Sequence, residues 1–581
     1  METPTTLTIP ASSPIRGGQM EPNNRKWFAL AATCFGLFMA LLDVTIVNVA
    51  LPTIQRDLHA TFADLQWVIS AYTLALAVFL VTAGRLGDIF GRKRTFMVGL
   101  GVFSLGSLLC ALSGDLTIGA LSHIDLLLGA RALQGLGGAV MLPLSLAIIS
   151  TTFQGKERGT AIGIWGGVTG LATAIGPLIG GVLVARVTWQ AIFYLNVPIG
   201  IVGIALSAWA IRETRDERAA RAVDLFGLVT ISVSLFCLVL ALIQGNDKGW
   251  TSPYILTLFG IAAVAVVAFV VGELRRANPM VDPRLFANAS FTGAAIAAFT
   301  LSAGLYALFF FLTLYFQNFL GFSALDTGLR FLPLSALVLI AAPLAGAQVG
   351  RRGPRPILVA GMVLITVSVA LMGGISSQHS QDAWLVLLPA FIIGGLGNGI
   401  VNPPISTIAV GTVSRARAGM ASGVNGVCRQ IGTAGGIAFL GAVLTARYNG
   451  YIHDKVLALR LPAPLAASIT PQVKHTIITG IQQAGTIAGS LGLPNDPSHP
   501  NPYAHSPLAP DLQRIACASF IAATTDILHI AAIILAVGAL VSLILVKRSD
   551  LLAPSEGADA GTDTTRATRA DTAASIVPAR S

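Results

Sequence analysis

The chain has 581 residues, of which 54% are hydrophobic and 11% are charged, and its formal net charge is +10. Its mean hydropathy of +0.74 means that apolar side chains exceed what one soluble core can bury, which excludes a soluble globular domain. The composition predicts a polytopic membrane protein. Anionic lipid at the inner leaflet explains the basic charge, so a nucleic-acid partner is not expected.

Apolar runs of about 20 residues, each long enough to cross a hydrocarbon core of about 30 Å as a helix, recur along the whole sequence. We predict about fourteen such helices, arranged as six, two and six. They are placed at 27–51, 65–83, 95–113, 124–150, 160–184, 191–211, 225–243, 253–272, 290–316, 327–348, 357–375, 384–408, 420–446 and 520–546. The fold class predicted is therefore all-α.

The predicted organisation follows from these helices and from the charge of their loops. Short loops on the side of Met1 hold about 18 Lys and Arg, against about three on the other side, so both termini are expected in the cytoplasm. The membrane expected is the cytoplasmic (inner) membrane. The parts are a cytoplasmic tail at 1–26, a six-helix bundle at 27–211, a two-helix insert with its loops at 212–289, a second six-helix bundle at 290–546 containing a long external loop at 447–513, and a disordered cytoplasmic tail at 547–581.

An internal duplication supports the two bundles. The segment Gly159–Gly181 matches Gly419–Gly441 at about eight of roughly 23 positions, most of them glycine. GRLGDIFGRKR at Gly84–Arg94 corresponds in the same way to GAQVGRRGPRP at Gly346–Pro356. Two repeated halves with a substrate path between them are typical of secondary transporters.

One carboxylate lies inside a predicted span. Asp43 is about 24 Å along its helix from Trp27, where an unpaired charge costs several kcal/mol. Arg131 in the fourth span is predicted at nearly the same depth. We predict that the two form a proton switch in which protonation of Asp43 couples to transport; the alternative is a static ion pair that only fixes packing.

The loop between the second and third spans predicts a cytoplasmic gate, with Gly84, Asp88, Gly91 and Arg92 as its residues. The glycines permit a tight turn, and Asp88 is placed to accept hydrogen bonds from a helix N-terminus in the other half. Arg92 is expected to face anionic lipid with the next two basic residues. The alternative is a solvated basic loop that serves only membrane topology.

The fifth span carries small residues on one face and a proline. Small residues let helix backbones approach closely, and proline removes a helical hydrogen bond, so this helix is predicted to pack and pivot against a partner. Packing without any function is the alternative. The residues are Gly170, Gly176, Pro177, Gly180 and Gly181.

Five segments together resemble the fourteen-helix drug:proton antiporter family of the major facilitator superfamily, the EmrB/QacA type. They are LDVTIVNVALP, GRLGDIFGRKR, RALQGLGG, GLATAIGPLIGG followed by TWQAIFYLNVPIG, and GMASGVNGVCRQIGTAGG. The resemblance spans roughly Lys26 to Arg548. It implies alternating access, proton-driven export, and roles for Asp43, Asp88, Arg131 and the glycine-rich fifth helix that agree with those above.

Further residues are predicted to line a substrate cavity, each with packing, interhelical hydrogen bonding or a helix-end ion pair as the alternative. They are Tyr72, Trp165, Asp326, Asn398, Asn425, Arg429 and Asp526. No phosphate-binding loop, metal-ligand spacing or nucleophilic triad is present in the sequence, so an enzyme is not expected, and neither a cofactor nor a metal is predicted.

These observations predict proton-coupled export of amphipathic small molecules such as drugs or antibiotics. The expected partners are the substrate, protons and the lipid bilayer, with a periplasmic adaptor and outer-membrane channel as further partners in a host with two membranes, reached through 447–513. The charge on Asp43 favours lipophilic cations as substrates, whereas the resemblance implies that neutral and anionic products are exported too, so both substrate classes stay open. The alternatives are an uptake symporter of the same fold and a non-transporting membrane sensor.

Overall fold

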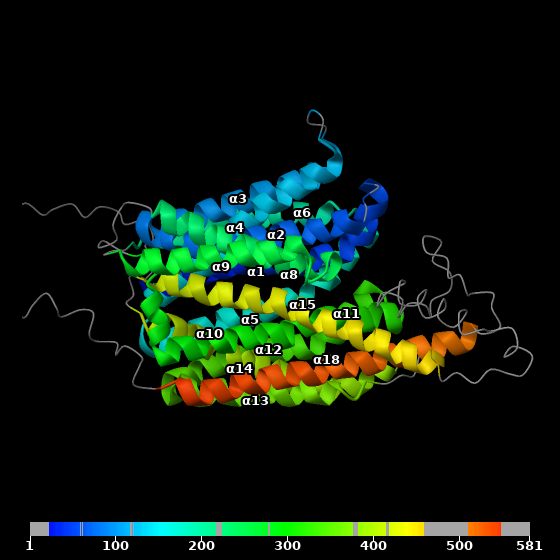
Figure 1. The fold of residues 1–581 in the computed structure, drawn as a ribbon. Helices are drawn as coiled ribbons and strands as arrows, with labels where there is room; N and C mark the ends of the chain where they lie inside the picture. Colours follow the sequence, from blue (N-terminus) through cyan, green and yellow to red (C-terminus); the bar gives the residue numbers. More distant parts are fainter. Residues whose placement is uncertain are drawn as a thin grey trace, which may run out of the picture.

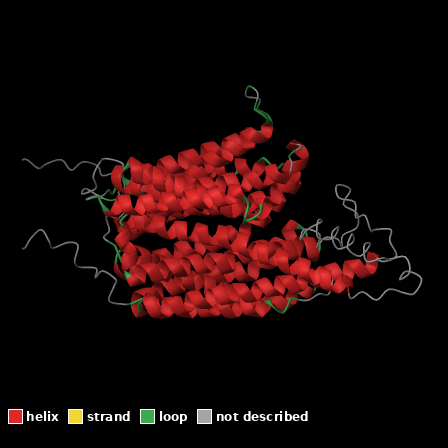
Figure 2. Ribbon diagram, viewed as in Figure 1, coloured by secondary structure: helices red, strands yellow, loops and turns green. Residues whose placement is uncertain are grey.

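Every regular element in the described part of the chain is helical (Figure 2). The computed structural model describes residues 22–58, 60, 62–116, 119, 121–215, 224–276, 279, 281–375, 382–413, 417–457 and 509–547. Most of the tails predicted at 1–26 and 547–581, and residues 458–508 of the predicted external loop, lie outside these ranges. The all-α prediction is confirmed.

The first half and the insert follow the predicted order of helices. Long apolar stretches form the helices, and short polar or glycine-containing segments separate them, as at Gly91 with φ 107°. The helices are α1 (Pro22–Leu58), α2 (Phe62–Phe90), α3 (Arg92–Leu112), α4 (His123–Thr152), α5 (Gly155–Arg186), α6 (Ala191–Tyr194), α7 (Asn196–Ala210), α8 (Leu225–Lys248) and α9 (Pro253–Leu274).

The second half repeats the pattern with more irregular turns. The π-helical turn η2 interrupts its first span, which was predicted as one regular helix, and a second π-helical turn, η3, ends that span. The elements are η1 (Pro283–Ala287), α10 (Ala289–Leu301), η2 (Ser302–Tyr306), α11 (Ala307–Leu314), η3 (Tyr315–Phe319), α12 (Ala324–Arg352), α13 (Pro354–Met372), η4 (Ala383–Leu387), α14 (Leu388–Gly411), α15 (Ala418–Leu457) and α18 (Ala509–Leu545).

The helices are long and apolar enough to form a membrane bundle. Twelve in the described ranges meet this test, and thirteen if the bent α2 counts as one span. α5 is a further helix of 32 residues packed between α1 and α12. The predicted fourteen spans are compatible with this arrangement.

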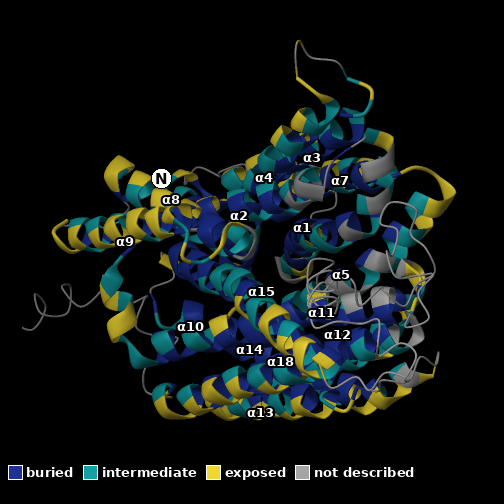
Figure 3. Cartoon of the chain, turned by 45° about the vertical axis from the view of Figure 1, so that its right-hand side comes forward, coloured by how far each residue is buried: buried dark blue, intermediate teal, exposed yellow. Residues whose placement is uncertain are grey.

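The two halves lie one above the other, and α5 and α15 run along the boundary between them (Figure 1). α5 packs along α12, and α15 packs along α2, so each half contributes one helix to each contact. α8 and α9 form a hairpin beside α2, and many residues of α9 are exposed (Figure 3). Because those side chains are largely apolar, such as Val264 at 72% exposed, this surface is suited to lipid.

One face of the bundle gathers the start of α1 and the end of α18, and is called the terminal face below. Arg25 near the start of α1 donates to the carbonyl oxygen of Trp209 at the end of α7, with a distance of 2.7 Å. The backbone amide of Lys547, just after α18, donates to Ser290 Oγ at the start of α10 at 2.8 Å. The ends of α2 and the starts of α3, α5 and α15 lie on this face (Figure 1).

α15 and α18 continue into the segment predicted as the external loop at 447–513. Residues 447–457 and 509–513 are helical, and both helices project beyond the bundle on the face opposite the termini (Figure 1). The reason is a buried stripe at helical spacing: Tyr448, Ile452 and Val456 join Leu512 and Ala516 in one apolar cluster. The predicted loop limits were therefore too wide at both ends.

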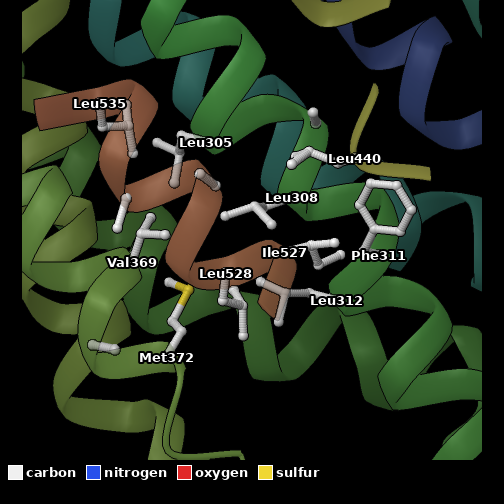
Figure 4. Close-up of a cluster of buried hydrophobic side chains, with 14 of the residues drawn as sticks. Leu305, Leu308, Phe311, Leu312, Val369, Met372, Leu440, Ile527, Leu528 and Leu535 are labelled. Carbon is white, nitrogen blue, oxygen red and sulfur yellow. The ribbon is translucent and has the colours of Figure 1, made fainter. Parts of the chain in front are cut away.

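The largest apolar core belongs to the second half. It is built by side chains of α10, α11, α13, α15 and α18 around Leu308, Ile527 and Leu528 (Figure 4). Leu528 and Met372 are both fully buried and come from helices far apart in the sequence. This shared core holds the helices of the second half together as one unit.

Candidate functional site

Asp43 and Arg131 form a buried ion pair between α1 and α4. Their predicted equal depth agrees with this contact. Asp43 has two further donors: Gln134 Nε2 lies 2.7 Å and Asn196 Nδ2 3.3 Å from its Oδ1. Arg131 also donates to Gln134 Oε1 at 2.7 Å, so the charge pair is one connected network within the membrane.

α2 supplies the other side of this charge site. Arg131 Nε donates to the carbonyl oxygen of Val68 at 3.0 Å, and the guanidinium carbon lies 4.4 Å from the centre of the Tyr72 ring. Tyr72 is fully buried, and its hydroxyl donates to the carbonyl oxygen of Ala40 at 2.9 Å. Tyr72 was predicted to line a substrate cavity, but in this structure it positions Arg131 instead.

Gln134 and Asn196 are the site residues that the sequence analysis did not select. Gln134 lies three residues after Arg131 and shares its helix face, which is a signal that was present. Asn196 reaches Asp43 across 153 residues, and Ser107 on α3 accepts its other hydrogen at 3.0 Å. Because Asp43 is fully buried among these partners, a lipophilic cation does not reach it in this conformation.

Asp88 joins the two halves at the terminal face. It is fully buried, and its Oδ2 accepts a hydrogen bond of 3.2 Å from the backbone amide of Met420 at the start of α15. Arg92 donates to its Oδ1 from Nε at 2.9 Å and from Nη2 at 2.7 Å. Arg92 was expected to face lipid, but it is 2% exposed because Asp88 and the helix ends enclose it.

Four glycines form two backbone contacts between the halves. A Cβ atom at Gly84 would lie 2.5 Å from the carbonyl oxygen of Gly419, and a Cβ at Gly159 would overlap the carbonyl oxygen of Gly346. The repeat relates Gly84 to Gly346 and Gly159 to Gly419, so the two contacts are equivalent by the internal symmetry. We call them the glycine contacts; one joins the last turns of α2 to the start of α15, and the other joins the start of α5 to the last turns of α12.

The glycine-rich face of α5 packs against α1 beside the charge site. Gly176 is in contact with Thr45, and Gly180 with Ile46, two and three residues after Asp43. Gly181 faces Leu325 of α12, whose Cβ lies 3.5 Å from where a glycine Cβ would stand. Gly170 and Pro177 lie in the same helix, but their surroundings are not among the features that the structure describes.

The second half contains a neutral polar cluster. The hydroxyl of Tyr306 in η2 donates a hydrogen bond to Asn398 Oδ1 at 3.2 Å, and Asn402 Nδ2 lies 2.9 Å from the same oxygen.

In the first half, Trp165 of α5 donates a hydrogen bond to Ser145 Oγ at 2.9 Å, which joins α5 to α4. These contacts use Asn398 and Trp165 in interhelical hydrogen bonds.

Two predicted cavity carboxylates have local partners: Asp326 lies in the first turn of α12, and Asp526 lies near the middle of α18. Asp326 is half exposed and accepts a 2.6 Å hydrogen bond from Ser323, the N-cap of α12, with Arg330 3.7 Å away. Asp526 accepts from the Tyr451 hydroxyl at 2.9 Å and lies 3.5 Å from Arg447, which joins α18 to α15. Their geometry is that of a helix cap and an interhelical tie.

Asn425 and Arg429 lie one turn apart on α15. Asn425 is 5% exposed, and its Oδ1 has no hydrogen-bond partner in the described part of the chain. Arg429 Nη2 is buried and likewise without a described partner. Among the described His, Cys, Asp and Glu residues no group is placed to hold a metal ion.

Comparison with known proteins gives consistent results. Residues 33–437 match the model of the Major Facilitator Superfamily. The chain is 34% identical to the Tetracenomycin C resistance and export protein of Streptomyces glaucescens, over 80% of this chain and 84% of that protein. It is 39% identical to the Multidrug resistance protein Stp of Mycobacterium tuberculosis, over 78% and 82%. Among solved structures, the human organic anion transporter MFSD10 matches with a TM-score of 0.54 at 16% identity, over 72% of this chain and 93% of that one, which shows a shared fold.

Proposed function

Because this chain belongs to the major facilitator superfamily, we propose that it exports amphipathic small molecules across the cytoplasmic membrane in exchange for protons. The observation that carries the proposal is the buried Asp43–Arg131 pair, a titratable carboxylate held within the membrane by three side chains. The names of two relatives, a resistance and export protein and a multidrug resistance protein, support export of drug-like molecules.

The proposed orientation puts the terminal face in the cytoplasm. Basic residues gather in its short loops, as the positive-inside rule expects, and Arg94 is 83% exposed at the start of α3. With this orientation, the glycine contacts and the Asp88–Met420 hydrogen bond belong to a state closed toward the cytoplasm. Alternating access then requires the glycine contacts and the Asp88–Met420 hydrogen bond to separate.

Protonation of Asp43 is the proposed coupling step. A neutral carboxyl group no longer balances the charge of Arg131, so the network with Gln134 and Asn196 must rearrange. α1 carries Asp43 and packs against the glycine face of α5 at Thr45. Because α5 also contacts α12, movement of α1 acts on the glycine contact between Gly159 and Gly346.

Everted membrane vesicles with an acidic interior test the proposal. Tetracenomycin C, the compound in the name of one relative, is expected to accumulate inside the vesicles while protons leave the interior. Asp43→Asn should abolish proton release, since the titrating group is removed, and Asp43→Glu should keep part of it. Asp326→Asn is the matched control, because that carboxylate is half exposed and accepts a hydrogen bond from Ser323, the N-cap of α12.

Each alternative gives a different result in the same vesicles. An uptake symporter reverses the direction of proton movement relative to the substrate, and a sensor moves neither. Proton release by Asp43→Asn at the wild-type rate would refute Asp43 as the coupling residue.

A further inference from the structure

Charged side chains deep in the bundle are expensive, so their partners identify what they do. Arg131 has Asp43 as its counter-charge. Arg447, further along α15 and largely exposed, has Asp526. Arg429, by contrast, forms no ion pair within the described ranges. It lies nine residues after Met420, which is about 14 Å along α15 from the terminal face.

The helix geometry places Arg429 toward the second half. Asn425, Arg429, Gly432 and Gly436 repeat at intervals of four, three and four residues, which puts them on one face of α15. Gly432 and Gly436 on that face contact Phe299, Ser302 and Ala303 of α10 and η2. Arg429 and Asn425 therefore face the interior of the bundle rather than lipid.

Both side chains retain unused hydrogen-bonding capacity. Arg429 Nη2 and Asn425 Oδ1 are buried and have no partner in the part of the chain that the structure describes. A guanidinium offers five donors, and an amide group can turn to present its NH₂. Arg429 can supply two parallel donors to one planar anionic group, and a turned Asn425 amide can add a further donor one turn away.

The first-half charge site does not compete for this role. Asp43 is saturated by Arg131, Gln134 and Asn196, so it neither neutralises Arg429 nor leaves an oxygen for a cationic substrate. The described mid-membrane part of the second half thus holds one positive charge with no counter-ion. A counter-ion supplied by the transported molecule removes that imbalance.

We propose that Arg429 and Asn425 bind an acidic group of the substrate, so that the transporter prefers amphipathic organic anions. The inference rests on the proposed function and narrows its substrate class. Arg429 supplies the charge and Asn425 a neutral hydrogen bond one turn away. Planar carboxylates fit a guanidinium best, because two parallel N–H···O bonds form at once.

Three probes that share one aromatic body separate charge from hydrophobicity: 2-naphthoate, its methyl ester and 2-naphthyltrimethylammonium. Equilibrium dialysis with the purified full-length protein gives the dissociation constant of each. The wild type should bind naphthoate at least tenfold more tightly than the ester, and the ammonium most weakly. A charge-assisted hydrogen-bond pair in a buried site corresponds to about tenfold to a hundredfold in affinity.

The variants locate the preference. Arg429→Gln should lose the tenfold or greater advantage of naphthoate while its affinity for the ester stays within about twofold of the wild type. Arg429→Lys should keep part of the advantage, because charge remains but the planar fork does not. Asn425→Ala should weaken naphthoate binding by less than Arg429→Gln. Arg447→Gln is the matched control on the same helix, since that arginine already has an acidic partner and is 60% exposed.

The outcomes distinguish a failure of the substrate-class inference from a failure of the proposed function. Equal wild-type affinity for naphthoate and ester, or an equal loss of all three probes in Arg429→Gln, would overturn the inference and leave a structural arginine. A failure of export is separate: probes that bind with the predicted preference but are not moved by a pH gradient in vesicles would refute the proposed function alone.

Discussion

Alanine at Gly419 tests whether the glycine contacts determine the conformational equilibrium. A Cβ at this position would lie 2.7 Å from the carbonyl oxygen of Gly84, and 2.7 and 2.9 Å from the two carboxylate oxygens of Asp88. Ordinary van der Waals contact begins at 3.4 Å, so α15 and α2 must separate by roughly 0.7 Å. The Asp88–Met420 hydrogen bond, already 3.2 Å long, would lengthen with them.

The strain acts on one state only. Overpacking of this kind costs about 1 to 3 kcal/mol, and it disappears when the terminal face opens. The ratio of open to closed molecules should therefore rise about 5- to 150-fold. Gly419→Ala should open the terminal face while the protein stays folded.

Spin labels at Arg94→Cys and Arg351→Cys, in a background without the native cysteines, report that ratio. The two positions are exposed, lie at the terminal face, and belong to different halves. Pulsed dipolar spectroscopy should show a new population at longer distance in Gly419→Ala. Gly101→Ala is the control, because a Cβ at Gly101 meets nothing within 4 Å. An unchanged distance distribution in Gly419→Ala would refute the reasoning.

Three further predictions concern charged contacts. Asp88→Asn should lower the transport rate at least tenfold in vesicles, because breaking a buried ion pair costs about 3 to 5 kcal/mol; a wild-type rate would leave the loop a topology signal only. Arg131→Lys should lose most substrate-driven proton release, since an ammonium cannot hold the acceptors on α1, α2 and α4 together; normal release would make the arginine a packing element. Burial opposes charge on Asp224, but the Gly227 amide and Arg276 outweigh it and lower its pKa. A lowered pKa stabilises the fold above the unfolded-state value of about 3.9, and this stabilisation is lost as pH falls through the folded-state pKa. Arg276→Ala should therefore lower the melting temperature at pH 7, and by progressively less as pH falls below about 3.9; a loss independent of pH would contradict this.

The depth of a residue along a helix could be predicted from the sequence, and the lateral neighbours of that residue could not. Asp43 and Arg131 were placed at one level because helical rise is constant and both spans have visible ends. A helix N-terminus in the other half was predicted as the partner of Asp88, as the Met420 amide shows, but the particular helix was not identified. Asn196 was missed as a partner of Asp43, because helix rotation and tilt are set by packing between segments far apart in the chain.

Helix ends followed the same rule. The sequence placed the end of the span in α15 at 446, where apolar character falls, but the helix continues to Leu457 because α18 covers its buried stripe. The π-helical turn at Ser302–Tyr306 also had no local signal. Arg92 was expected to be exposed because it lies in a basic loop. It is buried instead, and its burial depends on Asp88 and on the other half of the molecule.

The paired extensions of α15 and α18 matter for imaging the protein. α15 is 40 residues long, about 60 Å, or roughly twice the thickness of a hydrocarbon core. Most of the mass of a transporter of 60.2 kDa lies within the lipid or detergent belt, where single-particle images carry few landmarks. A rigid protein fused in helical continuity with Leu457 and Ala509 would be held by two helices that pack against each other, and so would fix particle orientation during alignment.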